Sequence, residues 1–124
     1  MQFLSDGWVA AVAKALNESE AVQAATKRTH AKVQQIVTKG DETLSYWVEL
    51  DDGVVRMGTG EIESPNITLT SDYETAAALA KGELSPMAAF MGGKVQISNM
   101  MAAMGLQGPL SEFGKVVKSI SAEF

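Results

Sequence analysis

The feature that most constrains the fold of this chain is a change in the spacing of its apolar residues near Thr29. Before that point apolar side chains recur every three or four residues. This spacing predicts a helix over 5–16 and a short second helix that begins at Ser19. After it the spacing falls to two, so that Val33 and Val37 share one face of an extended strand. The chain is therefore expected to begin with helices and continue into a β-sheet.

Short turns connect the segments that have two-residue spacing. Asp52 and Gly53 form a tight hairpin signal between alternating segments at 44–50 and 54–57. Three successive strands joined by such turns predict an antiparallel meander. Alternation of apolar and polar residues over 67–70 predicts a fourth strand after it.

The second half returns to helical patterns, interrupted by one more strand. Helices are predicted over 72–80, 85–91 and 109–122, each begun by a capping residue or a proline. A fifth strand is predicted over 94–98, and the apolar segment 100–106 is short and its structure ambiguous. Because no internal repeat or linker separates these elements, the sequence predicts a single α+β domain.

The composition excludes several kinds of chemistry. A chain of 124 residues with no Cys and one His has no disulfide framework, no thiolate nucleophile and no pair of imidazole metal ligands. The formal net charge of −5 disfavours a nucleic-acid partner, because phosphate contacts need clustered Lys and Arg. No segment is apolar for long enough to span a membrane, and the N-terminal sequence does not read as a secretory signal. We therefore expect one cytoplasmic domain over 1–124, with no metal and no cofactor.

Candidate catalytic groups are sparse. His30 lies in a predicted strand beside Lys32, without the nucleophile and orienting acid that a catalytic histidine requires. Asp51 and Asp52 are adjacent and therefore point apart, which suits a turn better than a pair of acid–base carboxylates. The Gly-Gly-Lys sequence at 92–94 leads into a strand, whereas a phosphate-binding loop leads out of a strand into a helix. We expect no catalytic residue and no enzymatic activity.

Methionine is prominent among the apolar residues that remain. Five of the seven methionines fall within 87–104, before a predicted terminal helix with an apolar stripe at Leu110, Phe113 and Val117. Residues of this kind most often pack in an ordinary core. Because methionine is unbranched and adaptable, the same residues would also make a soft wall for a flexible apolar ligand.

From residue 72 onward the chain carries an ordered set of residues with legible structural roles. Asp72 precedes a helix, Gly82 ends it, Pro86 begins the next helix, and Gly93 turns into the fifth strand. The positions that complete the set are Leu79, Leu84, Ser85, Ala89, Phe90, Met91, Lys94, Val95 and Ile97. The whole set resembles the sterol carrier protein type-two family of lipid-binding domains. One departure is a connection about one residue shorter after the fifth strand, where Asn99 is expected to support a left-handed turn.

The resemblance implies a twisted, mainly antiparallel five-stranded sheet with helices covering one face. It also implies an apolar tunnel between sheet and helices that takes fatty acids, fatty acyl-CoA, sterols or phospholipids, without catalytic residues. The terminal helix, preceded by Gly105 and Gly108, would then act as a movable lid. Either Tyr46 or Trp47 is expected to face the tunnel from the sheet. The other residues expected to bind the ligand are Met87, Phe90, Met91, Met100, Met101, Met104, Phe113, Val117 and Ile120.

The predicted function is non-catalytic binding or transport of a hydrophobic ligand, such as a fatty acid, a fatty acyl-CoA or another lipid. The alternative is an interaction module whose apolar C-terminal helix packs on a partner or a second copy, without ligand. We expect a small lipid as partner, no nucleic acid, no stable membrane insertion and at most transient contact with a membrane. Both a monomer and a homodimer are compatible with the pattern.

Overall fold

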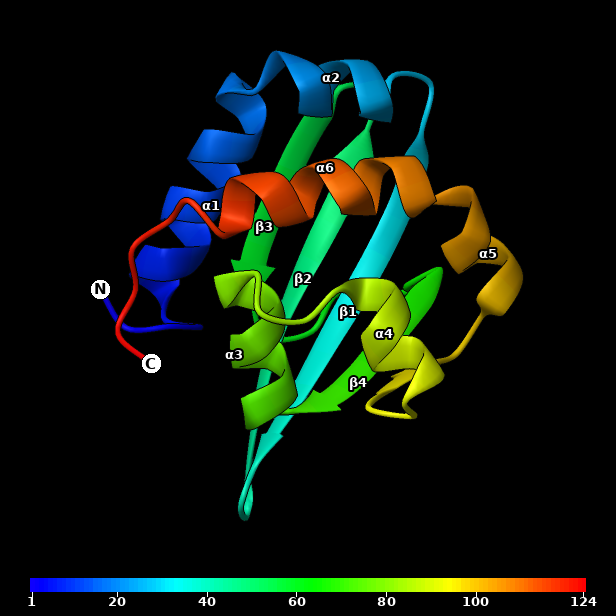
Figure 1. Cartoon of the computed structure of the whole chain (residues 1–124). Helices are drawn as coiled ribbons and strands as arrows, with labels where there is room; N and C mark the ends of the chain where they lie inside the picture. Colours follow the sequence, from blue (N-terminus) through cyan, green and yellow to red (C-terminus); the bar gives the residue numbers. More distant parts are fainter.

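A computed structural model describes the backbone of residues 1–124 and all side chains except those of residues 86 and 87. The helices are α1 (Asp6–Glu18), α2 (Glu20–Thr26), α3 (Tyr73–Lys81), α4 (Pro86–Met91), α5 (Met100–Gly105) and α6 (Gln107–Val117). The strands are β1 (His30–Lys39), β2 (Glu42–Asp51), β3 (Val54–Thr59), β4 (Ile67–Asp72) and β5 (Val95–Ile97). Helices precede and follow the sheet along the chain, as the change in apolar spacing predicts (Figure 1).

The five strands form one sheet in the order β3-β2-β1-β4-β5. The first three are the predicted antiparallel meander, in which Gln35 lies directly opposite Tyr46. Asp52 and Gly53 have positive φ angles of 46° and 90°, which suit the tight turn between β2 and β3. β4 runs parallel to β1 after a crossover, and β5 is antiparallel to β4. The prediction of a mainly antiparallel five-stranded sheet is therefore confirmed.

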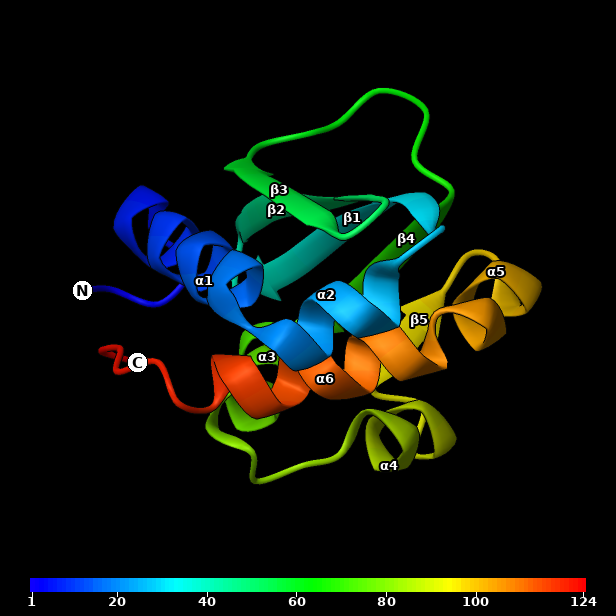
Figure 2. The ribbon, with the colours of Figure 1, turned by 90° about the horizontal axis from the view of Figure 1, so that it is seen from above.

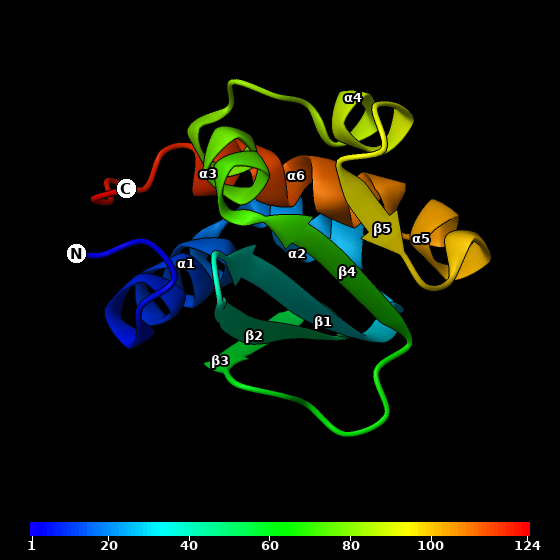
Figure 3. The same cartoon turned by 90° about the horizontal axis from the view of Figure 1, so that it is seen from below.

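The helices α1, α2, α3, α4 and α6 lie on one side of the sheet, and α5 lies beyond its β5 edge (Figure 2, Figure 3). The connection between β3 and β4 passes along the other side. Ser5, Ser19 and Asp72 cap α1, α2 and α3, because each side-chain oxygen accepts from a backbone N–H three residues further on. Gly82 ends α3 in the left-handed conformation, with φ 77°.

Two amide side chains attach neighbouring segments to the sheet. In α1, Asn17 donates to the carbonyl of Val55 at 2.8 Å and accepts from the N–H of the same residue at 2.9 Å. It therefore pairs with the edge strand β3 as another strand would. On the side away from the helices, Gln34 donates to the carbonyl of Gly60 at 3.0 Å and accepts from the N–H of Ile62 at 2.9 Å. These bonds fix the crossover connection against the sheet.

The core lies between the sheet and the helices. Alternate strand residues point toward the helices, while the apolar stripes of α1 and α6 point back toward the sheet. Full burial of one large aliphatic side chain contributes about 1.5–3 kcal/mol to folding. The largest side chains that are fully buried are Val12, Leu16, Val22, Thr26, Val37, Leu50 and Ile67.

In the second half the structure resolves one ambiguous segment and differs from the sequence expectation at two places. The segment 100–106, whose sequence was ambiguous, contains the helix α5. Asn99, expected in a left-handed turn, has φ −141° and caps α5 by accepting from the N–H of Ala102 at 3.2 Å. The helix α6 ends at Val117 and not near residue 122, because the residues after it leave the helix to meet the N-terminus.

The two ends of the chain lie side by side. Phe3 donates its N–H to the carbonyl of Glu123 at 3.0 Å, and Glu123 donates to the carbonyl of Met1 at 2.8 Å. The ring of Phe124 lies 4.7 Å from that of Phe3, measured between centroids, and the hydroxyl of Tyr73 donates to the Phe124 carbonyl at 3.0 Å. These contacts close the core near the start of α1 and of α3.

Candidate functional site

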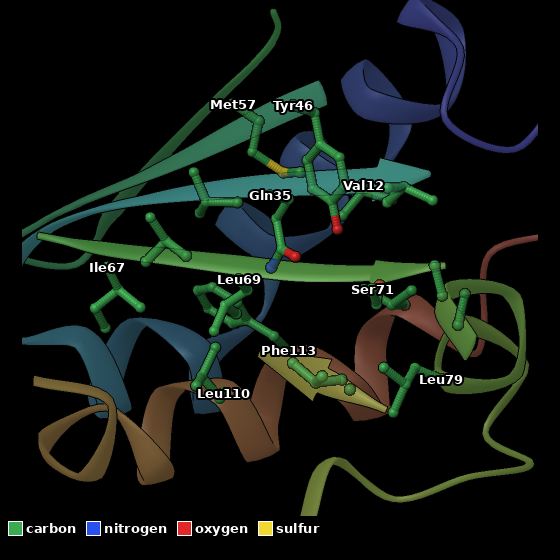
Figure 4. Close-up of a pocket in the computed structure, with 18 of the residues that line it drawn as sticks. Val12, Gln35, Tyr46, Met57, Ile67, Leu69, Ser71, Leu79, Leu110 and Phe113 are labelled. Carbon is green, nitrogen blue, oxygen red and sulfur yellow. The ribbon is translucent and has the colours of Figure 1, made fainter. Parts of the chain in front are cut away.

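An apolar cavity of about 240 Å³ lies between the sheet and the helices (Figure 4). The strand residues that face the helices form one wall, and residues of the helices and the N-terminal segment form the other. The wall from the sheet contains Val33, Gln35, Val37, Tyr46, Val48, Leu50, Met57, Ile67, Leu69, Ser71, Val95 and Ile97. The opposite wall contains Phe3, Trp8, Val12, Leu16, Ala76, Leu79, Ala80, Phe90, Ala103, Leu110, Phe113, Gly114 and Val117.

Alternation along β2 decides which of its two aromatic residues reaches the cavity. Tyr46 lines the cavity, and its ring lies 5.7 Å from that of Trp8 in an edge-on arrangement. Trp47 lies on the other side of the sheet, over Gly58, where a Cβ atom would be 2.5 Å from the Trp47 ring. Of the two aromatic residues that the sequence left open, Tyr46 is therefore the one at the cavity.

The helix α6 covers the cavity. Leu110, Phe113, Gly114 and Val117 recur at three- and four-residue spacing, so they share one face of the helix, and all four line the cavity. A Cβ atom at Gly114 would meet no neighbouring atom within 4 Å, which leaves open space beside the middle of this face. The helix predicted as a lid does cover the cavity, and its opening stays a prediction.

Phe90 of α4 lies in an exposed part of the cavity wall. Among the described lining side chains it has the greatest exposure, 37%, whereas the others are buried or half-buried. The principal neighbour of α4 is the short strand β5. This exposed part of the wall, beside α4, is the candidate mouth of the cavity.

Three polar side chains interrupt the apolar wall: Gln35, Tyr46 and Ser71. In Figure 4 the amide of Gln35 and the hydroxyl of Tyr46 point into the cavity. Burial raises the pKa of Tyr46 to about 12, so its hydroxyl stays protonated at neutral pH. None of the described side chains that line the cavity belongs to Asp, Glu, Lys, Arg or His. The interior therefore offers hydrogen bonds without charge.

The structure brings three of the predicted ligand-binding residues to the cavity. Phe90, Phe113 and Val117 line it. Ile120 follows the end of α6 and packs half-buried against the core, outside the lining. Met87 lies outside the described residues, so its place in the site stays a prediction.

The other predicted methionines are not brought to the cavity. Met91, Met100, Met101 and Met104 lie outside its lining and are 77%, 41%, 85% and 63% exposed. For the three methionines of α5 the reason is that this helix lies beyond the sheet edge and turns the small side chain of Ala103 inward. Most of the sheet residues in the cavity wall were not predicted from the sequence. The alternation of side chains along β1, β2 and β4 indicated which of them share a face.

The remaining candidate groups lie outside the cavity. His30 is exposed at the start of β1, with its Nδ1 3.1 Å from the carboxylate of Asp51. Gly92 and Gly93 form the turn between α4 and β5. Within the described part of the chain, no helix is both long and apolar enough to cross a membrane.

The fold and the cavity together define an α+β domain whose mainly antiparallel sheet and helices surround an uncharged apolar interior. The chain belongs to the SCP-2 sterol transfer family, whose sequence pattern matches residues 12–111. The resemblance in the second half of the sequence is thereby confirmed, and the match also includes much of α1 and the whole sheet. No curated protein matches the chain in sequence.

Solved structures share this fold. A crystal structure of sterol carrier protein 2 matches with a TM-score of 0.84 at 21% identity, over 97% of this chain and 100% of that chain. A solution structure of a conserved hypothetical protein from Thermus thermophilus matches with a TM-score of 0.83 at 21% identity, over 99% and 92%. Palmitated sterol carrier protein 2 like 2 from Aedes aegypti matches with a TM-score of 0.60 at 17% identity, over 94% and 95%.

Proposed function

We propose that this chain binds a flexible apolar molecule, such as the alkyl chain of a fatty acid or fatty acyl-CoA, in the cavity beneath α6. The observation that carries the proposal is a wall of aliphatic and aromatic side chains, in which no described residue is charged at neutral pH. Burial of apolar surface would drive binding, at about 0.8 kcal/mol per methylene. Membership of the SCP-2 sterol transfer family supports lipid binding or transfer as the general role.

The volume of the cavity limits what fits inside it. A cavity of about 150 Å³ holds one benzene ring, so about 240 Å³ accommodates on the order of ten carbon atoms by proportion. A flexible alkyl segment of that length suits the space better than the rigid fused rings of a sterol. The remainder of a longer chain, together with any charged headgroup, would extend through the mouth beside Phe90 into water.

The palmitated state of the Aedes aegypti protein supports an acyl chain as the ligand of a domain with this fold. In the present chain, no described lining side chain carries a charge that would pair with a charged headgroup. Selection among ligands would then depend on the alkyl segment. The binding free energies of ligands that differ by one carbon would differ only by the contribution of one methylene. We propose a carrier that holds one lipid chain with little discrimination between headgroups.

We propose that binding proceeds without catalysis. A serine nucleophile needs an adjacent base, and none of the described side chains in the cavity wall could accept the proton of Ser71 at neutral pH. Tyr46 is a protonated donor there, because its pKa is raised to about 12. His30, the sole histidine of the sequence, lies at the exposed start of β1 and outside the cavity.

The placement of the α6 stripe favours this role over an interaction module. Phe113 is buried, and Leu110, Val117 and Ile120 pack against the core of the same chain. The apolar face that the alternative assigned to a partner is thus already covered by the sheet and the other helices. A cavity remains beneath it, and this cavity is the space the ligand would fill.

The two tryptophans provide a direct test. Trp8 lines the cavity, whereas Trp47 lies across the sheet, so the second residue serves as an internal control. The variants Trp47→Phe and Trp8→Phe leave one emitter each. Both would be titrated with 11-bromoundecanoic acid, because bromine quenches tryptophan emission only at contact distance.

We expect saturable quenching of Trp8 at one equivalent of probe, and weak, non-saturating quenching of Trp47. Native mass spectrometry of the wild-type chain should show the same single-probe complex. Equal quenching of both residues would indicate surface adsorption and overturn the proposal, as would the absence of saturation. If Trp8→Phe does not fold, the wild-type chain is titrated instead. Quenching of Trp8 alone would then leave the part of the emission that comes from Trp47 unchanged.

A further inference from the structure

The sheet wall of the cavity carries a cluster of polar groups, Gln35, Tyr46 and Ser71, in positions where the strand pattern calls for apolar residues. Gln35 in β1 is directly opposite Tyr46 in β2. Ser71 in β4 is opposite Val37, the next inward-facing residue of β1, so it lies on the diagonal from Gln35. The other inward-facing residues of β1 and β4 at the cavity, such as Ile67, are apolar.

The polar ends of this cluster are not used by the fold. The side chains of Gln35, Tyr46 and Ser71 make no hydrogen bond to another described residue, although each is at least half-buried. No fully buried side-chain nitrogen or oxygen lacks a partner among the described residues, so these polar atoms keep accessible surface. Because all three residues line the cavity, that surface faces its interior (Figure 4).

The neighbouring glutamine shows what a structural role looks like in this sheet. Gln34 points to the other side, where its amide donates to the carbonyls of Tyr46 and Gly60 at 3.1 and 3.0 Å and accepts from Ile62 at 2.9 Å. The amide of Gln35 has no comparable set of partners. An aliphatic residue at position 35 would pack the wall without desolvating an unpaired amide, a desolvation that costs folding free energy.

The charge of the surroundings limits what the cluster could hold. None of the described lining side chains supplies a cation to pair with a carboxylate or phosphate. An ion in this apolar space would carry a large desolvation penalty. The cluster offers a protonated hydroxyl from Tyr46, a second hydroxyl from Ser71, and both a donor and an acceptor from Gln35.

We propose that Gln35, Tyr46 and Ser71 form a hydrogen-bonding subsite inside the cavity for one uncharged polar group, a hydroxyl or a carbonyl, of an otherwise apolar ligand. This inference rests on the proposed function and adds to it a chemical class. The preferred ligand has a neutral alcohol or carbonyl within the cavity, and it binds there more tightly than a hydrocarbon of the same length. The subsite also fixes how far the ligand inserts, because only one depth satisfies the hydrogen bonds.

The test compares 1-octanol with octane, which differ by one hydroxyl and both fit the available volume. Affinities would be measured by displacement of 11-bromoundecanoic acid from the full chain, with octane equilibrated from the vapour. The variants are Tyr46→Phe and Gln35→Leu, which remove the polar group and keep the approximate shape. The matched control is Gln96→Leu, the same change in β5 on an exposed residue outside the lining.

We expect each of the two cavity variants to weaken 1-octanol about fivefold, the effect of one hydrogen bond, while octane affinity stays within about twofold. Unchanged octane affinity also shows that the variants are folded. Gln96→Leu should change neither ligand. If both ligands bind the wild-type chain and the variants weaken 1-octanol no more than octane, the subsite is refuted while the proposed function stands. If neither ligand displaces the probe from the wild-type chain, the proposed function itself fails.

Discussion

The capacity of the cavity can be tested with a series of n-alkanols from propanol to tetradecanol. Each added methylene that enters the cavity contributes about 0.8 kcal/mol, which is about a fourfold gain in affinity. A cavity of about 240 Å³ holds on the order of ten carbons, by comparison with benzene in about 150 Å³. Plotted against chain length, the logarithm of the affinity should therefore rise steeply and then flatten near decanol.

Gly114 allows this limit to be moved. It lies at the centre of the cavity-facing side of α6, and a Cβ atom there meets no atom within 4 Å. Gly114→Leu adds four carbons, which at about 25 Å³ per carbon removes about 100 Å³ of the space. The break in the series should then move from about ten carbons to about six. The substitution should not unfold the chain, because replacing a helical glycine gains up to about 1 kcal/mol of helix propensity.

Isothermal titration calorimetry of both proteins measures the break directly. Ser111→Leu is the matched control, since it places the same side chain on the same helix at an exposed position outside the lining. It should leave the break near decanol. A constant slope through tetradecanol, in both the wild-type chain and Gly114→Leu, would refute the reasoning. It would mean that the walls expand with the ligand, as a lid that opens by moving α6 would allow.

Three further changes test the framework around the cavity. Asn17→Ala removes the paired hydrogen bonds to Val55 and should lower the free energy of unfolding by about 2 kcal/mol, measured by urea denaturation. Gly58→Ala places a Cβ atom against the ring of Trp47 and should cost about 1–3 kcal/mol, with probe affinity unchanged because the clash is on the far side of the sheet. Hydrogen bonds from Thr75, first from its side chain and then from its backbone, hold the pKa of Asp72 below its ordinary value. A lowered folded-state pKa stabilises the chain above the unfolded pKa, and this stabilisation is lost as the pH falls through the folded value. Asp72→Asn keeps a capping group, so its thermal midpoint should fall less than that of the wild-type chain between about pH 5 and pH 2.

Most of the fold could be predicted from local patterns, because its elements are begun and ended by residues with strong conformational preferences. Ser5, Ser19 and Asp72 begin helices at the predicted places, and Asp52 with Gly53 makes the predicted hairpin. The end of α6 could not be predicted in this way. Its apolar spacing continues past Val117, but the pairing of the two chain ends takes the last residues out of the helix.

The site was less predictable, because residue type does not reveal which way a short helix faces. Methionines at the edge of the fold looked like a lining by their chemistry, yet the inward position in α5 belongs to the small Ala103. The sheet wall was equally hidden. Alternation shows that Gln35 shares a face with Val33 and Val37, and only the packing of the helices shows that this face borders a cavity.

The pairing of the chain ends has a practical consequence for anyone who labels this protein. Phe3 lines the cavity, and its ring lies against that of Phe124. An affinity tag fused directly after residue 124 would be attached next to a ring that contacts the cavity wall through Phe3. Placed behind a flexible spacer, the same tag would leave the paired ends intact, so a comparison of short and long spacers is part of any reliable measurement of lipid affinity.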